Sequence, residues 1–327
     1  MVENQSRVKK EIGGYFALEL SLHRNTFHEK GIYVNSGRNA LELILRLISN
    51  IKKVYLPCFT CDVVLEPLIK TGISYSFYHI NLDLELSETV QLGKDEYIIY
   101  TDYYGIKDAY IHQLDEIYGD QLIVDYAQAL YAEPTNNCFY SPRKFVGIPD
   151  GGIAYINKDI NIDDFEKDSS IDKCGHLLIR HDSNASEGYH VFRSNSQKIK
   201  EQPIRRISDL TYTLYSSIDF KEISNRRLSN FYYLHKRLNH NNLLKIDTWG
   251  SFICPMVYPY YSSNNELKKK LIENKIYVAT YWPNVLEWCV STDVEYQLAD
   301  HVIALPIDQR YGKEEMEYII KLIEKYE

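Results

Sequence analysis

Apolar and polar positions in the first half of the chain alternate in a way that predicts short strands separated by helices. Between residues 30 and 157, six short runs rich in β-branched and aromatic residues are expected to be strands. The runs are Ile32–Val34, Val54–Leu56, Ile73–Tyr78, Tyr97–Thr101, Leu122–Val124 and Gly152–Ile156. Between the first two runs, one apolar helix face, expected to begin near Ser36 and Gly37, is formed by Ala40, Leu43, Ile44, Leu47 and Ile48. Strands that alternate with helices indicate βαβ units and a largely parallel sheet.

The second half of the chain has a different pattern. Residues 158–200 are rich in Asp, Ser, Asn and Lys with little periodicity, so we expect loops or insertions there. The elements expected after them are a helical stretch from Ile207 to Asn239, strand-like segments near Ser251–Tyr258 and Ile276–Thr280, and a last helix from Lys313. We therefore predict an α/β protein with a large domain over residues 1–205, in which the place of residues 1–14 is left open, and a smaller α+β domain over residues 206–327.

Composition and charge exclude several classes of partner. Of the 327 residues, 45% are hydrophobic and 25% charged, as is usual for an enzyme with a large core. The net charge is −8 and the Lys and Arg residues are scattered, so nucleic acid is not an expected partner. Residues 1–14 are polar, without an apolar run after their charges, and no run elsewhere is long enough to span a bilayer. We therefore expect no secretory signal, no membrane span and a cytoplasmic location.

The six cysteines suggest neither a disulfide framework nor a metal site. Cys58 and Cys61 form one Cys-x-x-Cys pair, which is compatible with a redox couple or with half of a zinc site. A zinc site needs a second pair, and the other cysteines are isolated: Cys138, Cys174, Cys254 and Cys289. Incidental or buried thiols in a reducing compartment are the favoured interpretation, and no metal is expected.

The predicted turn from strand to helix between Tyr33 and Ala40 is the first candidate for ligand binding. It contains Ser36, Gly37 and Arg38. Free backbone N–H groups and the positive end of the helix dipole favour an anion such as a phosphate at this place. An ordinary turn with Ser36 as N-cap explains the same residues, and it is the stronger explanation while the segment is taken alone.

A carboxylate follows the strand expected at Leu122–Val124. Asp125 ends the apolar run, and the polar side chain of Gln128 lies just beyond it. In open α/β sheets, ligands bind outside the carboxyl ends of the strands. A buried carboxylate needs a cationic partner, and a protonated pyridine nitrogen supplies one while the ring becomes an electron sink. A carboxylate that caps the next turn is an equally good interpretation of Asp125 alone.

A lysine lies in the middle of a loop punctuated by glycine and proline, between Phe139 and Gly152. Apolar and aromatic neighbours suggest that Lys144 is drawn inward, where its amine would be easier to deprotonate and able to form a Schiff base. Ser141, three residues earlier, could offer its hydroxyl to a phosphate. A solvated surface side chain is the general expectation for a loop lysine.

Taken together in order and spacing, these segments resemble the sugar aminotransferases of the DegT/DnrJ/EryC1/StrS group, within the fold-type-I enzymes that use pyridoxal 5′-phosphate (PLP). The strongest likeness is Lys144 followed six to eight residues later by Asp150, Gly151 and Gly152. Further segments that carry it are Asn-Ser-Gly-Arg-Asn-Ala-Leu at 35–41, Leu-Pro-Cys-Phe-Thr at 56–60, Tyr-Tyr-Gly at 103–105, Asp-Tyr-Ala-Gln-Ala at 125–129 and Ala-Leu-Pro-Ile-Asp at 304–308. The resemblance covers most of the chain and implies the fold-type-I architecture.

The resemblance also implies roles for individual residues. Lys144 would hold PLP as a Schiff base, Asp125 would pair with the ring nitrogen, and Gln128 would lie near the ring's substituents. The phosphate would be carried by Ser36, Gly37 and Arg38.

Three departures from the family pattern affect these assignments. Where the family has a serine five residues before the lysine, this chain has Phe139, so Ser141 is the candidate replacement. The family's ring-stacking aromatic aligns with Cys61, and Phe59 or Tyr104 is the candidate to stack instead. The segment Arg206–Leu210 weakly resembles one that crosses to the partner subunit's active site, although the usual Gly and Asn before it are absent.

The resemblance implies an enzyme that moves an amino group, with glutamate as the expected donor, to a nucleotide-linked keto-sugar in polysaccharide or glycoside biosynthesis. It also implies a homodimer. A PLP-dependent sugar dehydratase would need another base in place of Lys144. Two alternatives of other classes stay open: a non-catalytic binding or regulatory protein of the same fold, and an acyl hydrolase that uses Ser141 and Lys144 as Ser-x-x-Lys, although Ser-Asp-Asn and Lys-Thr-Gly are both absent.

Overall fold

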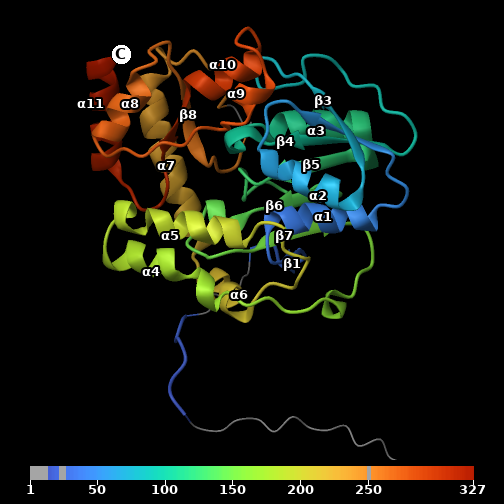
Figure 1. Ribbon diagram of the computed structural model, residues 1–327. Helices are drawn as coiled ribbons and strands as arrows, with labels where there is room; N and C mark the ends of the chain where they lie inside the picture. The colour runs from blue at the N-terminus through green and yellow to red at the C-terminus, as the bar shows by residue number, and fades with distance from the viewer. Residues whose placement is uncertain (1–13, 22–26, 249–251) are drawn as a thin grey trace, which may run out of the picture.

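A seven-stranded sheet organises the computed structural model, which describes residues 14–21, 27–248 and 252–327 (Figure 1). Its strands are β1 (Ile32–Val34), β2 (Lys53–Pro57), β3 (Ser74–Tyr78), β4 (Glu96–Thr101), β5 (Leu122–Tyr126), β6 (Asn137–Tyr140) and β7 (Gly152–Ile156). The spatial order is β1-β7-β6-β5-β4-β2-β3. The pairings from β3 to β6 are parallel, and β7 is antiparallel to both of its neighbours, β1 and β6. All six predicted strands are present, and β6 is the one that the pattern missed.

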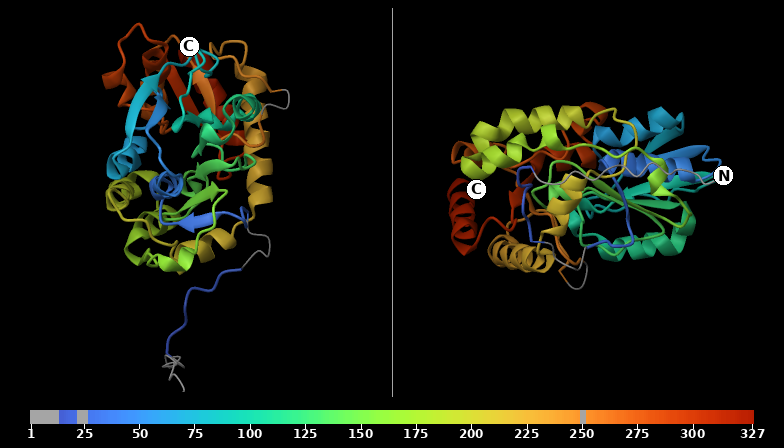
Figure 2. Two further views of the ribbon diagram at one scale, coloured as in Figure 1. Left: turned by 90° about the vertical axis from the view of Figure 1, so that its right-hand side faces the viewer. Right: turned by 90° about the horizontal axis from the view of Figure 1, so that it is seen from below.

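Helices cover both faces of this sheet. α1 (Gly37–Leu47) and α2 (Leu65–Thr71) lie on one face and α3 (Asp108–Tyr118) on the other, as the view from below in Figure 2 shows. The alternation of side chains along each strand explains this layering, because Ile99 packs with the α1 cluster whereas Ile98 and Tyr100 pack with the cluster that includes α3. The helix predicted to start near Ser36 begins at Gly37, with Ser36 as its N-cap.

The prediction of loops over residues 158–200 is wrong for much of that segment. It contains the helical pair α4 (Gly175–Asp182) and α5 (Ala185–Lys198). The Asn184 side chain caps α5 by accepting hydrogen bonds from the N–H groups of Ser186 and Glu187. No residue of α4 is buried, and only Gly188 and Asn195 are buried in α5, so the apolar periodicity that marks a packed helix is missing from the sequence.

The C-terminal part of the chain is helical around a two-stranded antiparallel sheet. Its elements are α6 (Asp209–Ser216), α7 (Phe220–Leu238), β8 (Val257–Tyr261), α8 (Leu267–Glu273), α9 (Val285–Trp288), α10 (Val294–His301), β9 (Val302–Pro306) and α11 (Lys313–Tyr326). The predicted 207–239 helix is divided after Ser216, because Asp219 caps a new helix. The last helix begins at Lys313, as predicted.

Two strand predictions in this part need correction. The segment expected near Ser251–Tyr258 becomes a strand only at Val257, and Ser251 lies outside the described residues. The segment at 276–280 is not a strand; it makes a single bridge, between Ala279 and Ala304. The proposed boundary at residue 205 stays a prediction, since one hydrophobic cluster contains residues from both sides of it.

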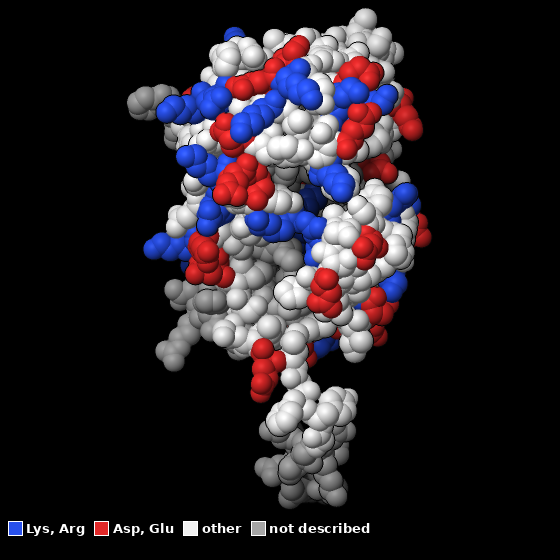
Figure 3. Space-filling view, turned by 90° about the vertical axis from the view of Figure 1, so that its left-hand side faces the viewer, with Lys and Arg blue, Asp and Glu red and all other residues white. Residues whose placement is uncertain are grey.

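Short 3-10 helices complete the described backbone: η1 (Asp62–Val64), η2 (Tyr103–Gly105), η3 (Gly119–Gln121), η4 (Pro142–Lys144), η5 (Ile162–Asp164) and η6 (Ile171–Lys173). In the described ranges, no helix is both long enough and apolar enough to cross a bilayer. Most of residues 1–14, on which the expectation about a secretory signal rests, lie outside the described part. On the face shown in Figure 3, acidic and basic side chains are interspersed and no basic band is visible.

Candidate active site

A cavity of about 460 Å³ lies beyond the carboxyl ends of β4 and β5, beside the start of α1. Most of the residues singled out in the sequence line it: Ser36, Gly37, Arg38, Cys61, Asp125, Gln128, Ser141 and Lys144. They come from separate segments of the chain, and the sheet topology brings them together. Ligand binding at this edge is what the open parallel sheet predicts.

One end of the cavity is formed by the N-terminus of α1. Ser36 Oγ accepts a hydrogen bond of 3.1 Å from the Asn39 N–H, so the N-cap interpretation of this serine is correct. β7 approaches so closely that a Cβ atom on Gly152 would lie 2.2 Å from the Ser36 carbonyl oxygen. A Cβ atom on Gly37 would lie 3.2 Å from Ser141 Cβ. These contacts place Ser141 directly against the first turn of α1, where an anion is favoured.

Asp125 lies near the end of β5, level with Thr101 on β4 and Phe139 on β6. It is 6% exposed, and its Oδ1 accepts a hydrogen bond of 2.8 Å from the Ala127 N–H. The turn-cap interpretation is therefore correct for one oxygen, while the residue also lines the cavity. Burial raises the pKa of Asp125 and the positive charge of Lys144 lowers it. A cation in the cavity would shift this carboxyl further toward its ionised form.

Three polar atoms that line the cavity are buried without a hydrogen-bond partner in the described part of the chain: Arg38 Nη1, Thr101 Oγ1 and Gln128 Nε2. Gln128 is fully buried, and its Oε1 accepts a hydrogen bond of 2.6 Å from the Tyr104 N–H, which fixes the direction of the amide. A buried donor without an acceptor costs about 1–3 kcal/mol. Such atoms gathered around one cavity indicate a polar ligand that supplies acceptors.

Lys144 ends η4 and lines the cavity, but it is exposed rather than drawn into the core. Its neighbours Phe145 and Val146 are buried, so the apolar residues of the loop anchor the backbone while the amine remains in the open cavity. The expectation of a buried lysine is therefore wrong, whereas its place beside Asp125 agrees with the prediction.

The structure separates Cys61 from Phe59 and Tyr104, the two residues expected to stack on the ring in its place. Cys61 lines the cavity, whereas Phe59 and Tyr104 are 0% and 1% exposed and are absent from its wall. Phe59 packs against Tyr103 and Trp282. The aromatic side chains that do line the cavity include Tyr281 and Trp282, from the C-terminal part of the chain, together with Phe139 and Phe192. Nothing local in the sequence marks Tyr281 or Trp282, because only the fold brings them to β5.

Two residues singled out by the sequence resemblance, Asp150 and Arg206, make structural contacts within the chain. Asp150 is buried and accepts hydrogen bonds from Ser170 Oγ, at 2.6 Å, and from Lys173 Nζ, at 2.9 Å. It therefore anchors the turn after Lys144 and is not part of the cavity wall. The guanidinium of Arg206, in the segment expected to cross to a partner, pairs with Asp163 and donates to the Phe165 carbonyl at 2.9 Å. Both partners of Arg206 belong to its own chain.

The Cys-x-x-Cys pair is not a metal site. Cys58 Sγ lies 2.9 Å from Cys289 Sγ, whereas Cys61 faces the cavity, and all six cysteines are free. In the described ranges, no group of three or more His, Cys, Asp or Glu residues is arranged to hold a metal.

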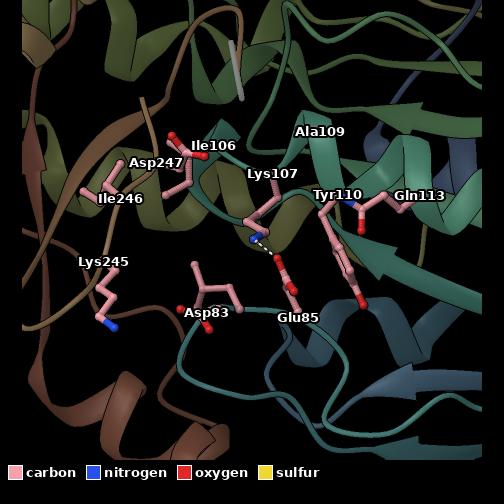
Figure 4. A pocket seen from close by; sticks show the side chains of 11 residues that line it. Asp83, Glu85, Ile106, Lys107, Ala109, Tyr110, Gln113, Lys245, Ile246 and Asp247 are labelled. Atoms are coloured by element: carbon pink, nitrogen blue, oxygen red, sulfur yellow. Dashed lines mark hydrogen bonds and ion pairs between the residues drawn. The ribbon is translucent and has the colours of Figure 1, made fainter. Parts of the chain in front are cut away.

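A second cavity, of about 230 Å³, lies between the start of α3 and residues 245–247 (Figure 4). There Lys107 Nζ is 2.6 Å from Glu85 Oε1, so this cation is already neutralised. The two cavities therefore differ in their chemistry, because only the larger one combines unpartnered buried donors with a free lysine and a buried carboxylate.

Comparison with known proteins gives matches at the level of structure alone. No protein-family model matches the chain, and no curated protein matches it. A DegT DnrJ EryC1 StrS aminotransferase from Brucella abortus is 15% identical over 90% of this chain and 85% of its own, with a TM-score of 0.58. DesI, solved in the presence of its TDP-sugar product, is 13% identical over 90% of this chain and 79% of its own, with a TM-score of 0.63. The fold is that of the DegT/DnrJ/EryC1/StrS aminotransferases.

A third structure with this aminotransferase fold is Spr1654 from Streptococcus pneumoniae, solved in a PLP-form. It is 16% identical over 91% of this chain and 88% of its own, with a TM-score of 0.60. The predicted fold class is thus confirmed: a mostly parallel sheet with helices on both faces and a small antiparallel sheet in the C-terminal part. The aminotransferase fold does not favour the acyl hydrolase interpretation of Ser141 and Lys144.

Proposed function

We propose that this protein is a PLP-dependent aminotransferase that transfers an amino group, with glutamate as donor, to a nucleotide-linked keto-sugar. The observation that carries the proposal is the cavity that combines Lys144, the buried carboxylate of Asp125 and three unpartnered buried donors. This donor set fits PLP, which presents a phosphate, a ring oxygen and a protonated ring nitrogen. When bound, PLP supplies an aldehyde for covalent attachment and a ring that withdraws electrons.

Each cavity residue then has a role that follows from its position. Asp125 would pair with the protonated ring nitrogen, and the response of its pKa to the positive charge of Lys144 supports this role. Gln128 Nε2, unpartnered and fixed by Tyr104, is the donor for the ring oxygen. Lys144 Nζ would hold the cofactor covalently and would serve as the general base for the proton on Cα of the amino donor. Cys61, Tyr281 and Trp282 form part of the cavity wall.

The choice of a nucleotide-linked sugar as acceptor rests on the fold and on the sequence resemblance. DesI, which has this fold, was solved with a TDP-sugar product. The motifs around Asp125 and Lys144 resemble those of the sugar aminotransferases. The product would enter polysaccharide or glycoside biosynthesis.

The direct test is covalent trapping followed by turnover. Wild-type protein incubated with PLP should be labelled on Lys144 after borohydride reduction and peptide mapping, whereas Lys144→Ala should not be labelled. Single turnovers with a panel of amino donors, followed by keto-sugar nucleotides, should consume and then restore the aldehyde form of the cofactor. Label on another lysine would refute the site. Label on Lys144 without any turnover would favour a non-catalytic binding protein.

We also propose that the protein acts as a homodimer. Two-fold dimers are the commonest oligomers, and the sequence resemblance implies one. In addition, residues 14–21 extend away from the body of the chain (Figure 2) and carry Tyr15 and Phe16, which are 99% and 93% exposed. Large apolar side chains held this far from their own core are typical of a segment that packs against another chain. A monomer by sedimentation at micromolar concentration, with PLP bound, would contradict this proposal.

A cytoplasmic location is proposed from the thiols. All six cysteines are free, and Cys58 Sγ lies 2.9 Å from Cys289 Sγ. Reduced thiols are expected in a reducing compartment. Six alkylated cysteines per chain, in protein trapped with an alkylating reagent at cell lysis, would support this location, and fewer would contradict it.

A further inference from the structure

Two arginines line the proposed cofactor cavity: Arg38, in the first turn of α1, and Arg143, in η4 next to Lys144. Burial and the positive charge of Arg38 lower the pKa of the Arg143 guanidinium, and the negative charge of Asp150 offsets part of this effect. Arg38 Nε lies 3.5 Å from Glu66, but its Nη1 is buried without a partner. Arg143 shows no ion pair in the described part of the chain, and its polar contact is a neutral one, with Ser196 Oγ at 3.1 Å.

Like charges that line one cavity destabilise each other unless an anion lies between them. An anion at this end of the cavity would meet three further favourable groups: the N-terminus of α1, Ser36 and Ser141. Two guanidinium forks with several N–H groups match an anion that has several oxygens and more than one charge. A phosphate monoester has that chemistry, whereas the carboxylate of an amino donor carries one charge and two oxygens.

We propose that Arg143, together with Arg38, clamps the phosphate of the cofactor, and that this chain supplies both cations itself. The inference rests on the proposed function. It adds a phosphate ligand that the sequence motifs did not assign, and it explains how the site holds a phosphate with Phe139 at the position of the usual serine. Arg206, the cation expected to act across a dimer interface, is occupied by Asp163 and Phe165 within its own chain.

Helix α5 holds Arg143 in position. Ser196 accepts its hydrogen bond, and the Arg143 guanidinium carbon lies 5.7 Å from the centre of the Phe192 ring. Both contacts come from one face of α5, and Ile199, just beyond the helix, also lines the cavity. Ser196 and Phe192 are therefore positioning residues for the clamp, and residues 158–200 contribute to the site through them.

The experiment compares PLP with pyridoxal, which has the same ring and aldehyde but no phosphate. Full-length apoprotein is titrated with each ligand in the wild type, in Arg143→Gln and in Arg193→Gln, a control that removes an exposed arginine of α5 outside the cavity wall. Loss of charge-assisted hydrogen bonds predicts that Arg143→Gln weakens PLP binding by roughly 10- to 100-fold. Its affinity for pyridoxal should change by less than about threefold, and Arg193→Gln should bind both ligands like the wild type.

A second readout needs no cofactor. At low ionic strength, inorganic phosphate should raise the thermal midpoint of wild-type apoprotein more than acetate does at equal ionic strength, and Arg143→Gln should lose this difference. Because the substitution removes a repulsion, the Arg143→Gln apoprotein should unfold no earlier than the wild type without phosphate. Arg143→Lys keeps the charge but not the planar fork. Its phosphate-specific rise in the thermal midpoint should lie between those of the wild type and Arg143→Gln.

The outcomes separate the clamp from the function. Equal weakening of PLP and pyridoxal by Arg143→Gln would reduce Arg143 to a structural residue, and unchanged PLP affinity would remove it from the phosphate site; both results would overturn the clamp. Failure of borohydride to label Lys144 in the wild type would overturn the proposed function instead. In that case, a phosphate-specific rise in the thermal midpoint that depends on Arg143 would still support an anion clamp at this cavity.

Discussion

The Arg227 guanidinium, buried in α7, donates a hydrogen bond of 3.1 Å to the Phe145 carbonyl, directly after Lys144 in the chain. It lies 4.7 Å from the centre of the Phe145 ring and also donates to the Met256 carbonyl at 2.9 Å. The Gln309 amide donates to the same Phe145 carbonyl at 2.9 Å. The backbone beside the proposed catalytic lysine is thus held by side chains of the C-terminal part, which couples the position of Lys144 to the packing of that part.

Replacing Arg227 should therefore cost both stability and order at the lysine. Arg227→Met leaves the Met256 carbonyl without this donor and removes one of the two donors to Phe145. Loss of two charge-assisted hydrogen bonds predicts a decrease of about 3 kcal/mol in the free energy of unfolding, measured by urea denaturation. Arg226→Met, at the exposed neighbouring position, should change it by less than about 0.5 kcal/mol. Equal effects of the two substitutions would show that the contacts with Phe145 and Met256 are unimportant for stability.

Gly152 should tolerate no side chain. In Gly152→Ala the new methyl group would lie 2.2 Å from the Ser36 carbonyl oxygen and 2.6 Å from the Gly37 nitrogen, both backbone atoms. The first turn of α1 must move, which we expect to cost about 1–3 kcal/mol of stability and to weaken PLP binding. Gly147→Ala is the control, since a Cβ atom there meets nothing within 4 Å. A Gly152→Ala protein with wild-type stability and PLP affinity would contradict this close approach of β7 to α1.

The sequence predicted the sheet better than it predicted the site. All six expected strands are present: the runs of β2, β4, β5 and β7 are largely buried, whereas β3, at the edge of the sheet, is mostly exposed. β6 escaped notice because it has only four residues and begins with the polar Asn137. At the site, Asp125 and Lys144 are brought together as predicted, because Asp125 lies near the carboxyl end of β5 and Lys144 lies in η4, shortly after β6, the parallel neighbour of β5.

The residues that were missed reach the cavity through tertiary structure. Ser196 lies on a helix with almost no buried apolar face, so periodicity could not reveal it. Trp282 comes from a segment far along the chain whose position depends on the packing of the C-terminal part. Arg143 is visible in the sequence beside Lys144, but its proposed role depends on its sharing a cavity with Arg38, which the spacing of the sequence does not show.

Stability should fall in mild acid because of His28. The ring is half-buried; its Nε2 donates to the Leu130 carbonyl at 2.7 Å, and Tyr155 OH lies 3.1 Å from Nδ1. Burial lowers the pKa of His28 to about 4, against a bond to Leu130 that raises it. A depressed pKa means that the contribution to stability is present above about pH 6.5 and is lost as the pH falls through 4, by about 3 kcal/mol at most.

Urea denaturation of wild type and His28→Gln at several pH values between 4 and 7 tests this prediction. The variant should be less stable than the wild type at pH 7, and the difference should shrink toward pH 4. His112→Gln, at an exposed position of α3, should follow the wild type throughout. A difference between His28→Gln and wild type that stays constant with pH would show that His28 does not titrate with folding.

The role of Asp125 makes the sharpest test of the proposed chemistry. Asp125→Asn keeps an oxygen that can accept the hydrogen bond from the Ala127 N–H, so the turn after β5 should survive. The neutral amide cannot keep a ring nitrogen protonated in the cavity, which weakens the ring's capacity to withdraw electrons. We therefore expect PLP to be trapped on Lys144 as in the wild type, while the rate of amino transfer falls about a hundredfold or more, as for loss of a strong electrostatic element.

Asp115→Asn, which changes an exposed carboxylate on α3, is the control for the change of charge. Near wild-type turnover in Asp125→Asn would mean that this carboxylate only caps the turn, and loss of trapping together with turnover would mean that it is needed to hold the cofactor at all.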